Sequence, residues 1–171
     1  MKVRKINKWL SYGLAVAALC SPLALGGAAV AGEPATEGVV MDKMYAVNPP
    51  GANIPGISQA MVVNDGKLMF LSGHVAINAE GAFSGSTVEE QLEQVLANIA
   101  LTLKEANADF SNVARVTIYV KDYDLSMLPV IRQVRDKFVN SEKPPASALI
   151  GVASLFHPES LVEVDAIAVL N

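Results

Sequence analysis

Two periodicities of apolar residues alternate along this chain and predict the order of its elements. The segments in which every second side chain shares a face, as in a strand, are residues 59–63, 68–73, 113–120, 146–152 and 161–169. Residues 88–106 and the segment around Pro129 instead repeat apolar positions every three or four residues, which is typical of a helix lying on a sheet. The order predicts an α+β fold, a single sheet with two helices on one face.

Turn and cap signals support these boundaries. Residues 59–63 and 68–73 are predicted to form a hairpin, because Asn64-Asp65-Gly66 tolerates the positive φ of a tight turn. The long helix is expected to start at Ser86-Thr87-Val88-Glu89, where a Ser hydroxyl and a Glu carboxylate can satisfy free backbone amides reciprocally. Pro129 fits the first turn of the second helix, where the missing amide is not needed.

Two acidic residues on the last strand mark a candidate site. Alternation places Glu163 and Asp165 on one face about 7 Å apart, among aliphatic residues, where an unpaired charge is unfavourable. This indicates a functional site, or acids that reach solvent at a strand edge or pair with a base across a subunit contact. Ser72-Gly73 ends an earlier strand, and the glycine either forms a β-bulge or lets a backbone or ligand come close.

Residues 1–31 have the composition of a signal peptide. Four basic residues precede an apolar run over 9–25, and Ala29-Val30-Ala31 provides the small-x-small pattern of a cleavage site. A permanent membrane helix fits less well, because the run is short and Ser21-Pro22 interrupts it. We therefore expect a periplasmic or secreted protein with no stable membrane insertion after cleavage.

Charge narrows the choice of partners. Cleavage after Ala31 would remove four of the 13 basic residues and none of the 17 acidic ones, so the net charge would fall from −4 to −8. This balance argues against nucleic acid, whose phosphates are neutralised by Lys and Arg. The mature chain would have no cysteine, and His74 and His157 are expected to be structural, so we expect no metal site.

The mature chain is expected to consist of an arm and one domain. Residues 32–58 contain four prolines and are predicted to be an extended arm in which no regular element runs far. Residues 59–171 show no repeat or second composition block and are predicted to be one domain, whose bare apolar sheet face other copies would cover. Arg115 is expected to point away from the helices. The basic residues of the second helix are expected to be solvated, with Arg132 a candidate anion contact.

Several motifs resemble those of one family. Leu71-Ser72-Gly73-His74 resembles a strand ending in Ser-Gly-Gln, and residues 116–122 resemble a Thr-x-Tyr-x-x-Asp segment. Pro145-Ala146 resembles a Pro-Ala-Arg segment, and residues 162–168 resemble a closing Val-Glu-Ile-Glu-Ala-Ile-Ala. On these motifs, residues 61–169 resemble the Rid superfamily (RidA/YjgF family), the reactive intermediate deaminases once labelled endoribonuclease L-PSP.

The resemblance implies a chorismate-mutase-like fold assembled as a homotrimer. Three sheets would close into a barrel with the helices outside and three intersubunit clefts for a small-molecule ligand. Active members hydrolyse 2-imino acids to 2-oxo acids and ammonia without a cofactor. Their arginine after Pro-Ala holds the substrate carboxylate, and the first glutamate of the closing strand, here Glu163, positions the attacking water.

One departure from the family pattern changes the expected chemistry. The arginine position is Ser147, and a hydroxyl cannot replace a planar cation that clamps a carboxylate. Arg115 or Arg132 could supply charge from another direction. The site residues predicted on this basis are Glu163 as general base, with Ser72, Gly73, Ser147 and Asp165 contacting the substrate.

Two functions from different classes follow. The first is a hydrolase of imines, enamines or amides whose substrate is altered because Ser147 replaces the arginine. The second is a non-catalytic, exported, trimeric small-molecule-binding or scaffold protein. A nuclease, which the older family label suggests, fits least well with the acidic charge balance.

Overall fold

The computed structural model describes residues 42–52 and 54–171, so the predicted signal peptide and the start of the arm lie outside the described residues. The strands of the described part are β1 Met44–Val47, β2 Ala60–Val63, β3 Lys67–Val75, β4 Val113–Lys121, β5 Ala146–Val152 and β6 Val162–Leu170. The α-helices are α1 Val88–Glu105 and α2 Leu128–Arg135, and single 3₁₀ turns precede β4 and α2. None of these helices is both long and apolar enough to cross a membrane.

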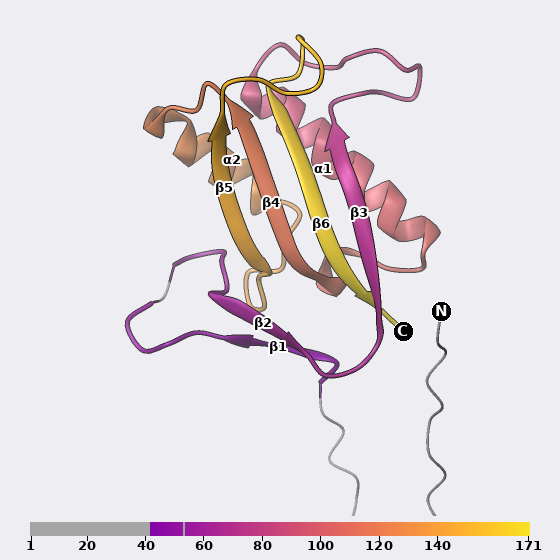
Figure 1. Ribbon diagram of the computed structural model, residues 1–171, viewed down its shortest axis with the longest axis vertical. Helices are drawn as coiled ribbons and strands as arrows, with labels where there is room; N and C mark the ends of the chain where they lie inside the picture. Colours follow the sequence, from indigo (N-terminus) through magenta and orange to yellow (C-terminus); the bar gives the residue numbers. More distant parts are fainter. Residues whose placement is uncertain (1–41, 53) are drawn as a thin grey trace, which may run out of the picture. The chain divides into compact units, whose positions relative to one another are not determined.

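Four strands form a mixed sheet in the order β3-β6-β4-β5. The closing strand β6 runs antiparallel to both of its neighbours, whereas β4 and β5 are parallel and are connected through α2. Both helices lie on the same side of this sheet (Figure 1). The predicted α+β architecture with two helices on one face is therefore confirmed.

The long helix is positioned by its cap and its apolar stripe. Thr87 is the N-cap, and its hydroxyl accepts from the Glu90 amide while the Glu90 carboxylate accepts from the Thr87 amide. The predicted capping pair of Ser86 and Glu89 was thus one residue too early. Backbone amides, that of Ser86 foremost, bond to the Glu90 carboxylate and lower its pKa. The buried residues of the helix are Gln91, Leu92, Val95, Leu96, Ile99 and Leu103.

The predicted hairpin of β2 with β3 is wrong. β2 pairs antiparallel with β1, a strand inside the segment expected to be an extended arm, and the two form a separate two-stranded sheet. The Asn64 amide and side chain bond back to the carbonyls of Lys43 and Asp42. The turn therefore closes on β1, and Gly66, with a φ of +109°, turns the chain into β3 of the larger sheet.

The two faces of the four-stranded sheet have different surroundings. The helix face carries the core, in which side chains such as Val116, Val164 and Ala166 pack against α1. The other side, which we call the open face, carries the alternate positions of the same strands; register places Phe70 beside Ile167, and Tyr119 beside Glu163. A small cluster of Met44, Ala114 and Val169 joins the two-stranded sheet to the larger one.

Candidate functional site

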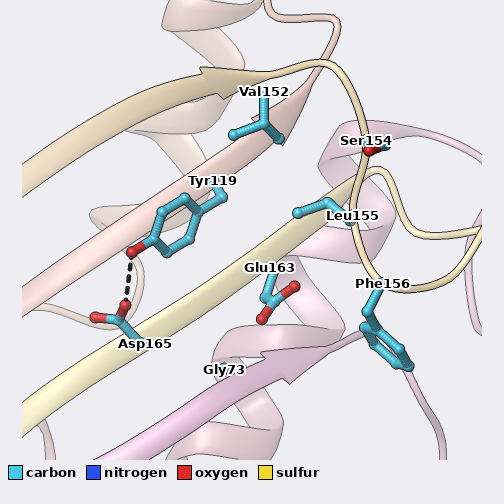
Figure 2. Close-up of a pocket in the computed structure, with 8 residues that line it drawn as sticks. All are labelled: Gly73, Tyr119, Val152, Ser154, Leu155, Phe156, Glu163 and Asp165. Atoms are coloured by element: carbon cyan, nitrogen blue, oxygen red, sulfur yellow. Dashed lines mark hydrogen bonds between the residues drawn. The ribbon is translucent and has the colours of Figure 1, made fainter.

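A pocket of about 360 Å³ lies on the open face where β6 begins. Strands β3, β4 and β6 form its floor, and the loop that follows β5 forms its rim (Figure 2). Its lining residues are Gly73, Tyr119, Val152, Ser154, Leu155, Phe156, Glu163 and Asp165. Three of the five predicted site residues, Gly73, Glu163 and Asp165, therefore border one pocket.

Gly73 makes room for the Glu163 side chain. The β3–β6 register shifts between Leu71 and His74, so the Ser72-Gly73 segment forms the β-bulge that was one explanation for this glycine. A Cβ atom at Gly73 would lie 2.0 Å from Glu163 Oε1. The close approach expected at this glycine is therefore that of the Glu163 carboxylate, which rests above the bulge (Figure 2).

Asp165 is bound to a tyrosine on the neighbouring strand. The Tyr119 hydroxyl donates a hydrogen bond of 2.9 Å to Asp165 Oδ2, and the bond crosses the open face between β4 and β6 (Figure 2). This bond, with burial and the negative charge of Asp165 as smaller causes, raises the pKa of Tyr119. Tyr119 is thus held as a protonated donor to Asp165 Oδ2.

Gln91 fixes the loop that forms the pocket rim, a role that the sequence analysis missed. Its side chain is 2% exposed. Nε2 donates to the Glu159 carbonyl at 2.8 Å, and Oε1 accepts from the Leu161 amide at 2.8 Å. The only sequence signal for this role was a polar residue adjacent to the apolar stripe of α1.

Two further side chains hold the end of β3. Asn98 in α1 donates to the carbonyls of Val75 and Ile77 at 3.1 and 2.8 Å. The His74 ring contacts the Ser72 carbonyl through Nδ1 at 2.7 Å and the Thr102 hydroxyl through Nε2 at 3.0 Å. His74 belongs to the Leu71-Ser72-Gly73-His74 motif that carried the family resemblance. In this structure both side chains fix the bulge beside Glu163.

Ser72 and Ser147 do not join this pocket within one chain. Ser72 is exposed and does not line the pocket. Register pairs Ser147 on β5 with Val116, a residue of the helix-face core. Ser147 is therefore on the opposite face of the sheet from Glu163 and Asp165. A contact between Ser147 and these acids requires a second copy of the chain.

Neither arginine considered as a substitute cation reaches the pocket in one chain. Arg115 is on the open face beside Ile167, but it lines a second pocket of about 370 Å³ next to β2. Arg132 is exposed on α2, on the helix side of the sheet. Arg135, expected to be solvated, is instead 4% exposed and donates to Asp136 and to the Pro55 carbonyl.

Among residues 42–52 and 54–171, no group of three or more His, Cys, Asp or Glu side chains is arranged to hold a metal ion.

The protein is an α+β subunit. Both helices lie on one face of its sheet, and an acidic pocket lies on the other. The chain belongs to the family described as Endoribonuclease L-PSP, which matches residues 52–170. This finding confirms the resemblance to the Rid superfamily that the motifs predicted.

Relatives and solved structures agree with this assignment. The chain is 38% identical over 113 residues to the putative regulator AldR of Lactococcus lactis, covering 64% of this chain and 83% of that protein. It is 30% identical over 122 residues to the human 2-iminobutanoate/2-iminopropanoate deaminase, covering 70% and 83%. The crystal structure of the Rid-family protein YyfB from Yersinia pestis superposes with a TM-score of 0.68 at 31% identity, covering 75% and 100%. These similarities support a Rid-like function.

Proposed function

We propose that this protein hydrolyses the carbon–nitrogen double bond of small reactive imines, or of the enamines in equilibrium with them, without a cofactor. The observation that carries the proposal is the position of Glu163. Glu163 is the first glutamate of the closing strand, and its side chain lies over the Gly73 bulge and borders a pocket. A relative whose name describes imine deamination supports the reaction class.

The chemistry needs one general base and a held water molecule. Glu163 accepts a proton from water as the water oxygen bonds to the imine carbon, and the electron pair of the double bond moves to nitrogen. Glu163 then returns this proton to the nitrogen, which gives a neutral carbinolamine. In a second transfer Glu163 takes the hydroxyl proton and passes it to the nitrogen, so that the carbon–nitrogen bond breaks with ammonia as the leaving group while an electron pair of the oxygen forms the new carbonyl. The products are a carbonyl compound and ammonia, and Glu163 is returned as a carboxylate.

We propose further that the working form is a homotrimer whose subunits cover each other's open faces. Leu68 and Phe70 on β3 and Ile150 on β5 are exposed large apolar residues of this sheet, and Phe70 is 72% exposed. An apolar sheet face of this kind normally marks a contact with another copy of the chain.

A second candidate function is that of an exported small-molecule-binding or scaffold protein without catalysis. Ser147 at the arginine position favours it, because the residue that would hold the carboxylate of an imino acid is missing. The basic and apolar segments of residues 1–31, with a small-x-small site, favour export to the periplasm or medium.

The test is the release of ammonia from imines that an oxidase generates in the same solution. We expect the wild-type protein to accelerate release above the spontaneous rate, and Glu163→Gln to lower the acceleration by about a hundredfold, the usual size of a lost general base. Glu105→Gln, the same change at an exposed glutamate at the end of α1 outside the pocket lining, is the matched control and should retain activity. If neither a 2-imino acid nor a carboxylate-free imine is hydrolysed, the binding function replaces the enzymatic one.

A further inference from the structure

The candidate pocket carries two acidic side chains and no basic one. Glu163 and Asp165 are two of its eight lining residues, and none of the eight is Lys, Arg or His. The ion pairs found among the described residues do not include either acid. Of their oxygens, Asp165 Oδ2 is the acceptor of the Tyr119 hydroxyl, which leaves the others for a ligand or water. The field in this pocket is therefore negative.

The nearest basic residues on the open face are directed elsewhere. Lys121 follows Tyr119 on β4, and its ammonium is 3.5 Å from the Pro158 carbonyl, outside the pocket lining. Arg115 lines the other pocket. Ser147, the residue at the family's arginine position, is a neutral hydroxyl, so this position supplies no positive charge from any copy of the chain. A ligand carboxylate would thus meet two like charges without a partner.

The rest of the lining suits an apolar body with a positive charge. Val152 and Leu155 supply apolar surface, and Tyr119 and Phe156 supply aromatic rings on two sides of the acids (Figure 2). Aromatic rings and carboxylates together are the groups that recognise organic cations. The same groups repel a carboxylate, because both the ring faces and the acids are negative.

We propose that the ligand of this pocket is an organic cation without a carboxylate: a protonated imine derived from a primary amine, rather than a 2-imino acid. The inference rests on the proposed hydrolase function and specifies its substrate class. The net reaction is R₂C=NH₂⁺ + H₂O → R₂C=O + NH₄⁺. The positive charge lies beside Glu163 and Asp165 in the substrate and leaves with the ammonium ion.

Binding of a charge-matched pair tests the ligand class without requiring turnover. The probes are 1-phenylethylamine and 2-phenylpropanoate, which have the same skeleton and opposite charges at about pH 7. Calorimetry on the protein produced from its full coding sequence should show the amine binding at least about tenfold more tightly than the acid. Glu163→Gln and Asp165→Asn should each remove most of this preference. Equal binding, or tighter binding of the acid, overturns the inference.

Lys121→Met separates this inference from its strongest rival, in which the Lys121 ammonium turns into the pocket and holds a carboxylate. We expect the variant to bind 1-phenylethylamine as tightly as the wild type or more tightly, because a nearby positive charge is removed. The rival is correct if the wild-type protein binds 2-phenylpropanoate as tightly as the amine and Lys121→Met loses that binding.

Turnover then distinguishes failure of this inference from failure of the proposed function. The substrates are 2-iminopropanoate, made by an amino acid oxidase, and acetophenone imine, made from 1-phenylethylamine by an amine oxidase. Faster hydrolysis of acetophenone imine supports both proposals. Rapid hydrolysis of 2-iminopropanoate alone overturns the substrate class and leaves the hydrolase. Acid-dependent amine binding with no hydrolysis of either imine supports the cation site and refutes the hydrolase.

Discussion

The two faces of the four-stranded sheet are built from the same strands and differ in almost every other respect. The helix face is mainly aliphatic, and its core residues are buried under α1 and α2. The open face carries two acids, a tyrosine and exposed apolar residues such as Phe70. Strand alternation alone produces this contrast, because each residue step moves the side chain to the other face.

The difference shows where stability and function are located in this subunit. Core side chains on the helix face have all their contacts within the chain. Groups on the open face, including Glu163, have contacts still available for a ligand or another subunit. Substitutions on the helix face should therefore change the free energy of unfolding, whereas substitutions on the open face should change association or hydrolysis.

The largest expected effect is on the helix face. Ile99 is fully buried, so Ile99→Ala should lower the free energy of unfolding by about 2–5 kcal/mol, measured by urea denaturation. Leu101→Ala, on the exposed side of the same helix, is the control and should change it by less than about 0.5 kcal/mol.

Phe70→Ala is the corresponding large-to-small substitution on the open face. The variant should show a smaller fraction of trimer in sedimentation experiments, and its melting temperature should depend less on protein concentration. The substitution leaves no cavity in the core of the subunit. A wild-type protein that sediments as a monomer at all concentrations would remove the role given to this face.

The next prediction tests whether the β-bulge at Gly73 positions the Glu163 carboxylate. In Gly73→Ala, the new Cβ would collide with Glu163 Oε1, and the flexible carboxylate can move away at small cost in stability. We expect the melting temperature to change little, whereas imine hydrolysis should fall by about a hundredfold, because a displaced general base loses its alignment. Unchanged hydrolysis in a folded Gly73→Ala protein would show that the position of Glu163 over the bulge does not matter.

The smallest effect concerns the titration of Tyr119. Its pKa is raised chiefly by the hydrogen bond to Asp165, so the stability from this bond is fully present below the ordinary tyrosine pKa and is lost as the pH rises through the raised value. Asp165→Asn should move the Tyr119 titration to lower pH, measured by NMR of the tyrosine ring carbons. Asp65→Asn, an acid-to-amide change in the exposed turn before β3, is the control and should leave the Tyr119 titration unchanged.

Local pattern was sufficient to predict most elements and three of the eight residues that line the pocket. The apolar stripe of residues 88–106 and the alternation of 161–169 are repeated over many residues, so α1 and β6 were placed almost correctly. The pairing of Glu163 with Asp165 on one face follows from a spacing of two. The β-bulge and the close approach were the two alternatives given for Gly73, and the Glu163 carboxylate that approaches it was not predicted.

Relations between strands were not predictable in the same way. Residues 60–63 have an alternating pattern that fits either neighbour, and the backbone bonds of Asn64 decide for β1. Ser147 was predicted to contact the substrate, and within one chain the parallel register with β4 places it on the other face from Glu163. Gln91 looked like an ordinary helix residue, and its burial depends on the loop 68 residues away.

The sequence by itself determined the family, the helix and strand order, and the acids of the closing strand, because each of these depends on residues close together in the chain. Only the tertiary structure decided which strands pair, which face each strand presents and which groups enclose the acids. The physical reason is that hydrogen-bond register and burial are set by partners distant in sequence.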